Sequence, residues 1–99
     1  MTVLDSFIDE MLQTEVPKTV FINTLLRALE VPKKPKFTVP ASPYTFESNI
    51  HGLRYDYQAN EVCLCYKVVP SIYADMVISF RSFKVILEGL GICIRMQKW

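Results

Sequence analysis

The sequence predicts an α+β fold, in which a small antiparallel sheet of about three to five strands is covered on one face by helices. Two observations predict it. Apolar residues recur with helical spacing in the first 30 residues, whereas from residue 53 they alternate with polar residues, as in a half-buried strand. The chain has 99 residues, of which 51% are apolar and 21% charged, so we expect one domain with a modest core.

The first 30 residues are expected to form a helical hairpin segment. Residues 3–12 place apolar side chains at i, i+3, i+4, i+7 and i+8, and Thr2 is available as the N-cap. A second helix is expected from about Val16 to Leu29, with Thr14 as its cap and Pro17 in its first turn, where proline is tolerated. Each helix is too short to be stable alone, so both must pack on other elements.

Residues 31–44 are expected to be an extended linker, because four prolines disfavour both a helix and a central strand. The densest positive charge of the chain, Lys33, Lys34 and Lys36, lies in this segment, with Phe37 beside it. Such a run is typical of a contact with an anionic surface or of nuclear import, and equally of a solvated linker that like charges keep extended.

Residues 45–99 are expected to form a β-rich core built on a hairpin from about Leu53 to Val69. Two alternating runs flank a polar turn, in which Asn60 can adopt a left-handed conformation. The face that we expect to be buried carries Leu53, Tyr55, Tyr57, Val62, Leu64 and Tyr66. The opposite face is half-polar and carries Arg54, Asp56, Glu61, Cys63, Cys65 and Lys67.

The remainder of the chain allows two interpretations at one point. Residues 72–79 fit a third strand, with Met76 and Ile78 on one face, or the start of a helix. A helix is expected near residues 80–89, with Gly89 and Gly91 as its stops, followed by a last strand from Ile92 to Gln97.

Three cysteines and one histidine raise the question of a metal site. Cys63 and Cys65 share a strand face, Cys93 is expected on the last strand, and His51 lies just before the hairpin. Three thiolates and an imidazole are a known zinc set, but one C-x-C with distant partners lacks the usual paired spacing. We therefore favour cysteines that act as small apolar residues, and we predict neither a metal nor any other cofactor.

The odd cysteine count and the absence of a secretory signal favour an intracellular protein, cytoplasmic or nuclear. No apolar run approaches the roughly 18 residues that a membrane span requires. There is no glycine-rich phosphate loop and no hydrolase or calcium-loop motif. We therefore expect no enzyme and no catalytic residues.

The leading hypothesis is a small protein-interaction or regulatory module that binds another protein and itself, as a homodimer. Short viral accessory proteins often have this size and composition, which is an analogy and not a sequence match. A nucleic-acid-associated protein that uses the basic run and sheet aromatics is the alternative, and a small zinc module is the second alternative. The expected partner-binding residues are Lys33, Lys34, Lys36, Phe37, Arg54, Cys63, Cys65 and Lys67.

Overall fold

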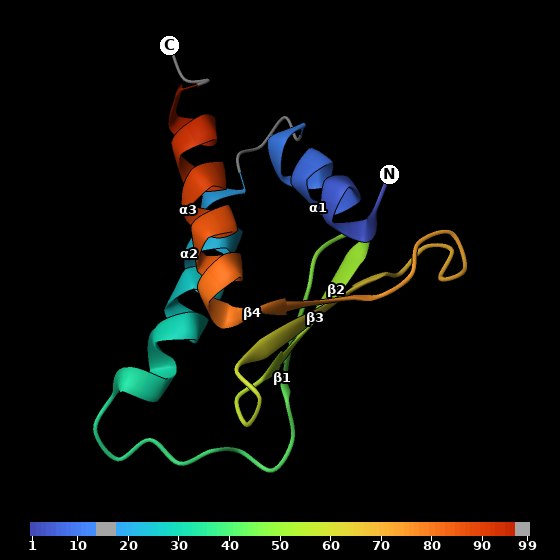
Figure 1. Ribbon diagram of the computed structural model, residues 1–99. Helices are drawn as coiled ribbons and strands as arrows, with labels where there is room; N and C mark the ends of the chain where they lie inside the picture. The colour runs from blue at the N-terminus through green and yellow to red at the C-terminus, as the bar shows by residue number, and fades with distance from the viewer. Residues whose placement is uncertain (14–17, 97–99) are drawn as a thin grey trace.

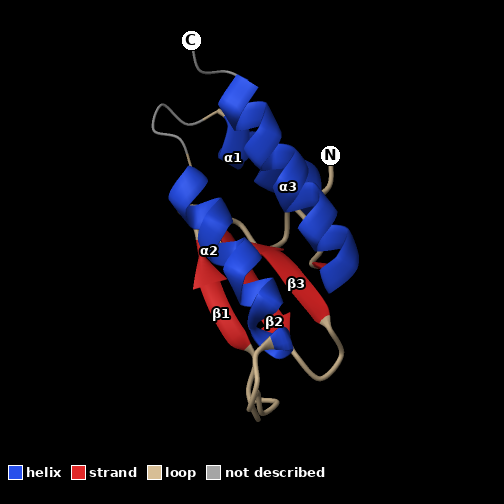
Figure 2. Cartoon of the chain, turned by 90° about the vertical axis from the view of Figure 1, so that its left-hand side faces the viewer, coloured by secondary structure: helices blue, strands red, loops and turns tan. Residues whose placement is uncertain are grey.

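The computed structural model describes residues 1–13 and 18–96 and has the expected α+β architecture, a four-stranded antiparallel sheet with three helices packed against it (Figure 1). Viewed from the side, the helices form one layer and the strands the other (Figure 2). The elements follow in this order: α1 (Val3–Leu12), α2 (Thr19–Glu30), the 3₁₀ helix η1 (Val31–Lys33), β1 (Tyr44–Glu47), β2 (His51–Asp56), β3 (Glu61–Tyr66), β4 (Met76–Ser79) and α3 (Phe80–Met96).

The predicted hairpin is confirmed as β2 and β3, the centre of a sheet with the strand order β1-β2-β3-β4. Leu53 lies opposite Leu64 in the register, and Tyr55 lies opposite Val62. Asn60 has the left-handed conformation that its place in the turn requires, with φ 56°. The Asp56 carboxylate accepts hydrogen bonds from the backbone N–H groups of Gln58 and Ala59, which stabilises the turn.

The core lies between the sheet and the helices, and it contains the hairpin face that alternation predicted to be buried. The buried rings of Tyr55 and Tyr57 extend from the sheet side of the core to α2. Their hydroxyls donate to backbone carbonyls of α2, at 2.9 Å to Leu25 and 2.6 Å to Ala28. The two bonds satisfy the polar ends of buried rings and fix α2 on the sheet.

The two N-terminal helices are present. In α1, Thr2 and Asp5 form a reciprocal capping box. Helix α2 is observed from Thr19 to Glu30, and the expected start at Val16, with Thr14 and Pro17, lies outside the described residues. The linker prediction was wrong at both ends, because Val31–Lys33 forms a 3₁₀ turn and the segment from Tyr44 pairs as β1.

The helix expected near residues 80–89 is confirmed as the first part of α3, but the prediction of its end at the glycines and of a strand after them was wrong. Helix α3 passes through Gly89 and Gly91, so Ile92 to Met96 is helical and not a strand, while Gln97 lies outside the described residues. Its buried side chains keep the helical period across both glycines; they are Phe83, Leu87, Leu90 and Ile94. Burial of this stripe outweighs about 1 kcal/mol of helix propensity lost at each glycine.

Residues 72–79 follow the strand interpretation only in their second half. Strand β4 covers Met76–Ser79 and directs Ile78 into the core. The preceding segment, residues 67–75, projects from the sheet as a long loop, drawn in gold and orange in Figure 1. Helix α3 then contacts α1, α2 and the sheet, so it is the central element of the helical layer.

Within residues 1–13 and 18–96, no helix combines the length and the apolar character needed to cross a lipid bilayer.

Candidate functional site

The sheet has one covered face and one open face. The helices lie on a single side of it, so the side chains that alternate outward from the strands contact solvent (Figures 1 and 2). This open sheet face contains all four residues that the hairpin was predicted to offer to a partner. Arg54 lies on β2, Cys63 and Cys65 lie on β3, and Lys67 directly follows β3.

Arg54 is at the centre of the open sheet face. Its guanidinium lies 3.8 Å from the Cys63 thiol, a hydrogen bond that raises the pKa of Arg54. Among the described residues Arg54 forms no ion pair, although Asp56 and Glu61 line the same shallow hollow of about 250 Å³. The hollow is wide open, so it provides a charged surface and not an enclosed pocket.

At the Lys67 end of the open sheet face, the side chains contact other residues of the same chain. Lys67 bonds the Glu47 carboxylate at 3.3 Å and the Ser48 carbonyl at 3.1 Å. A Cβ atom at Gly52 would lie 3.0 Å from the Cys65 sulfur. The absence of a side chain at Gly52 therefore lets the Cys65 thiol lie against the β2 backbone. Lys67 therefore has a carboxylate partner within the chain, whereas Arg54 bonds only the Cys63 thiol and no carboxylate among the described residues.

The structure does not bring the three thiols and the imidazole together, although Cys93 was expected on a strand beside Cys63 and Cys65. Cys93 lies on α3 and not on a strand, because the helix continues through the glycines. His51 belongs to the covered face of β2, opposite to the face of Cys63 and Cys65. In the part of the chain that the structure describes, no three His, Cys, Asp or Glu side chains gather closely enough to hold a metal ion.

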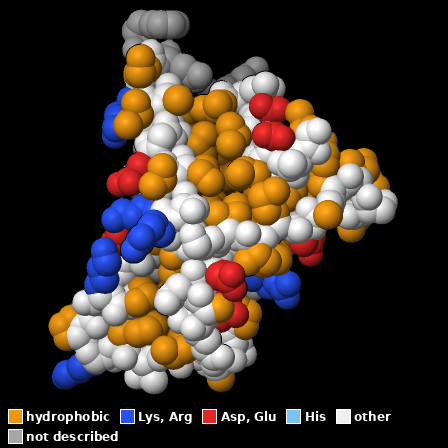
Figure 3. Space-filling view, viewed as in Figure 1, with side chains coloured by type: hydrophobic (Ala, Val, Ile, Leu, Met, Phe, Trp, Pro, Cys, Tyr) orange, Lys and Arg blue, Asp and Glu red, His pale blue; other side chains and the backbone are white. Residues whose placement is uncertain are grey.

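The basic run of the linker lies beside the start of α3. The Glu30 carboxylate forms ion pairs with the ammonium groups of Lys33, at 2.8 Å, and Lys84, at 3.1 Å. These two interactions lower the pKa of the Glu30 carboxyl. Arg81 lines the same shallow hollow as Lys33 and Lys84. Lys and Arg side chains accordingly gather along the left edge of Figure 3, over the end of α2 and the start of α3.

Phe37 does not extend the basic run outward as a stacking element. It is half-buried, and its ring packs edge-on against Tyr57 at a centroid distance of 5.7 Å. The sheet aromatics Tyr55 and Tyr57 also lie on the covered face. Neither group therefore forms the exposed stacking platform that single-stranded nucleic acid requires.

The sequence did not predict a buried polar network between α1 and the sheet. The His51 ring bonds Glu10 through Nδ1 at 2.7 Å and Ser6 through Nε2 at 3.1 Å. Ser48 donates to the same Glu10 oxygen at 2.6 Å and accepts from the His51 backbone N–H. The network links the first helix to β2 and to the turn before it.

Ser6, His51 and Glu10 are in the order of a hydrolytic triad, but their surroundings do not suit that chemistry. The His51 side chain is 0% exposed and that of Glu10 only 6%. Ser6 lies inside a helix, where its own N–H is bonded to the Thr2 carbonyl, so it cannot serve as an oxyanion donor. The arrangement therefore acts as a structural clamp.

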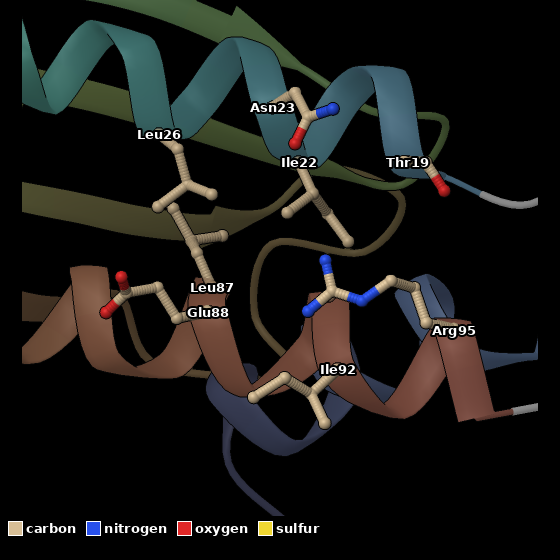
Figure 4. A pocket seen from close by; sticks show the side chains of 9 residues that line it. Thr19, Ile22, Asn23, Leu26, Leu87, Glu88, Ile92 and Arg95 are labelled. Carbon is tan, nitrogen blue, oxygen red and sulfur yellow. The ribbon is translucent and has the colours of Figure 1, made fainter.

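A groove lies between α2 and α3, with a volume of about 380 Å³ (Figure 4). Its floor is apolar and includes Ile22, Leu26 and Leu87. In Figure 4 Arg95 reaches from α3 toward Ile22 on α2, and Glu88 lies farther back along α3. Gly91 leaves the groove open, since no atom lies within 4 Å of the position that its Cβ would take.

The solvent side of α3, next to this groove, carries large exposed apolar side chains. Val85 is 65% exposed, Ile92 is 49% exposed and Met96 is 73% exposed. Gly89 is exposed between them, and a Cβ atom added to it would meet no other atom within 4 Å. We call Val85, Gly89, Ile92 and Met96 the α3 stripe.

Comparison of the chain with protein-family models, with curated proteins and with solved structures gave no match. The function is therefore inferred from the surfaces of this molecule alone.

Proposed function

We propose that the protein is a small, non-enzymatic interaction or regulatory module that acts through self-association and partner binding. The observation that supports this proposal best is the exposure of large apolar side chains on α3, a helix that also forms the core. Exposed apolar groups that are contiguous on one face mark association surfaces in proteins of this size. Several polar side chains are, by contrast, buried in the clamp or paired at the surface, as His51 with Glu10, Lys67 with Glu47 and Lys84 with Glu30.

The proposal is tested by the molar mass of the full chain, measured by light scattering as a function of protein concentration. We expect the mass to rise from 11.4 kDa toward twice that value, and an apolar-binding dye to fluoresce with the protein under dilute conditions. A constant mass of one chain at high concentration, without dye binding, would contradict self-association.

A second function is favoured by one specific observation, the position of the basic run. Lys33 and Lys84 share Glu30, and Arg81 lies in the same hollow, so the basic cluster is larger than the linker alone. Such a cluster suits the phosphate backbone of a nucleic acid without reading its bases. The chain should then be retained on immobilised heparin at low salt and released steeply as salt rises, and no retention would exclude this role.

An intracellular location, cytoplasmic or nuclear, is part of the proposal. The sequence has an odd number of cysteines, and the structure has all three as free thiols, which suits a reducing compartment. Cys93 is exposed, so its alkylation rate in intact cells can test this assignment. Rapid labelling is expected, and a thiol that is already oxidised would contradict the assignment.

A further inference from the structure

We propose that the α3 stripe is the self-association surface, and that it pairs in antiparallel orientation with the α3 stripe of a second copy of this chain. This inference rests on the proposed function, because it names the surface through which the module associates with itself. The spacing, exposure and charges of α3 support it.

The spacing of the α3 stripe is symmetric about its own midpoint. Its four residues are separated by four, three and four positions, so Val85 and Met96 are equally far from the centre, as are Gly89 and Ile92. These steps keep all four on one side of a helix. A two-fold axis through the midpoint therefore places Val85 of each copy opposite Met96 of the other, and Ile92 opposite Gly89.

The shapes at these positions are complementary. Ile92 is a branched side chain that projects into solvent, and it would meet Gly89, which has no side chain. The space above Gly89 is empty within 4 Å of a Cβ position, so the second helix can approach closely and receive the Ile92 side chain. The same contact occurs twice, as the two-fold symmetry requires.

The charges beside the α3 stripe are complementary in the same register. Glu88 and Arg95 both line the groove on the α2 side of α3, and neither forms an ion pair within residues 1–13 and 18–96. An antiparallel two-fold axis keeps both copies' groove-side charges on the same side of the pair. Glu88 of one copy then lies about two residues, roughly 3 Å along the axis, from Arg95 of the other, which both side chains can span.

A parallel arrangement of the two helices would lose these features. A two-fold axis parallel to the helices would place the groove-side charges of the two copies on opposite sides of the pair, so Glu88 of one copy could not meet Arg95 of the other. It would also place Ile92 beside Ile92 and leave the space at Gly89 unfilled. A second copy in antiparallel orientation therefore satisfies both the charges and the shape of this face.

The first experiment measures dimer dissociation by sedimentation equilibrium for the full chain and for Ile92→Glu. A carboxylate at the centre of the pair should raise the dissociation constant by about tenfold or more. Val20→Glu is the matched control, because Val20 is also an exposed apolar residue on a helix, at 76%, and lies off the α3 stripe. It should dissociate as the unchanged protein does, and both variants should keep the unchanged far-ultraviolet circular dichroism.

The second experiment exchanges the two charges. Glu88→Lys and Arg95→Glu should each weaken the dimer, because each creates like-charged contacts in both symmetry-related positions. The double variant Glu88→Lys/Arg95→Glu should restore most of the lost affinity, since the pairs are re-formed with reversed sign. Losses that simply add in the double variant would overturn the proposed register.

The outcomes separate this inference from the proposed function. A dimer that resists Ile92→Glu and both charge changes would overturn the α3 pairing but leave self-association intact, through another surface. A chain that stays monomeric at all concentrations would contradict both. Both are supported if Ile92→Glu dissociates the dimer and if, in the separate charge experiment, the double variant regains the affinity that each single variant loses.

Discussion

At the scale of single residues, the most consequential feature is the clamp formed by His51, Glu10, Ser6 and Ser48. It places His51 and Glu10 inside the apolar layer, where hydrogen bonds to both ring nitrogens and to Oε1 of Glu10 offset the cost of burial, while Oε2 of Glu10 has no partner among the described residues. The Phe7 ring packs edge-on against His51 at 5.7 Å and holds the imidazole in position. The clamp thereby fixes the angle at which α1 meets the sheet.

Loss of the imidazole should therefore be costly. We expect His51→Ala to lower the free energy of unfolding by about 3 kcal/mol, because it leaves the buried Glu10 carboxylate without its ring partner. Ser48→Ala removes the hydroxyl that donates to Glu10 and accepts from the His51 backbone N–H at the edge of the clamp, and it should cost about 1 kcal/mol. Urea denaturation measures both values, and equal small losses for the two variants would contradict a clamp.

Tyr55 and Tyr57 give the fold a dependence on alkaline pH. Burial raises the pKa of both phenols above the ordinary value of 10, so the folded state favours the neutral hydroxyl. Above about pH 10 the unfolded chain releases these protons and the folded chain does not, so stability present below that pH is lost as pH rises. Tyr55→Phe/Tyr57→Phe should flatten this decline in urea denaturation, and an unchanged slope would contradict the assignment.

Sequence reasoning could have found part of the clamp. His51 continues the inward alternation of Leu53 and Tyr55, so its burial was predictable from the strand period. Ser6 and Glu10 are one helical turn apart on the flank of the apolar face of α1. Their contact with His51 depends on how the helix docks on the sheet, across about forty residues of chain, and local patterns do not contain that information.

At the scale of elements, helix α3 is the main departure from the sequence prediction. Two glycines within three residues normally indicate a helix end, but here the apolar period continues through them. The hairpin, by contrast, was predictable because alternation, turn chemistry and register agree with one another. Strand β1 was missed, since four residues behind a proline-rich segment give little periodic signal.

The helical state of Gly91 can be tested by one substitution. Gly91→Ala should raise the free energy of unfolding by up to about 1 kcal/mol, because alanine favours a helix and no atom lies within 4 Å of the new methyl group. Gly52→Ala is the contrast, since its methyl group would press on the Cys65 sulfur at 3.0 Å, and it should destabilise the fold. A Gly91→Ala variant of lower melting temperature would indicate a helix end at this position.

At the scale of the whole molecule, the layers leave two unlike surfaces. The molecule measures 41 × 35 × 19 Å, a flat shape in which the open sheet face and the outer side of α3 point in different directions. The open sheet face is charged around Arg54, whereas the α3 stripe is apolar. The sequence predicted the first surface correctly as an exposed face, but it could not predict the second because residues 92–97 were expected to be a strand.

The assignment of the two sheet faces has a direct test. Leu64→Asp should unfold the domain, because Leu64 is fully buried and the new carboxylate would have no partner. Cys65→Ser, on the neighbouring residue of the same strand, should change the melting temperature only slightly, because its side chain lies on the open sheet face. The opposite ranking in thermal denaturation would mean that the faces are exchanged.

The most direct test of the antiparallel α3 pair is disulfide cross-linking between two single-cysteine proteins, Val85→Cys and Met96→Cys, in a chain whose three native cysteines are replaced by serine. A disulfide requires Cα atoms within about 7 Å. We predict that a mixture forms the mixed Val85→Cys–Met96→Cys dimer far faster than either protein cross-links with itself. Preferential cross-linking of each protein with itself, or no mixed dimer at all, would contradict the antiparallel pair.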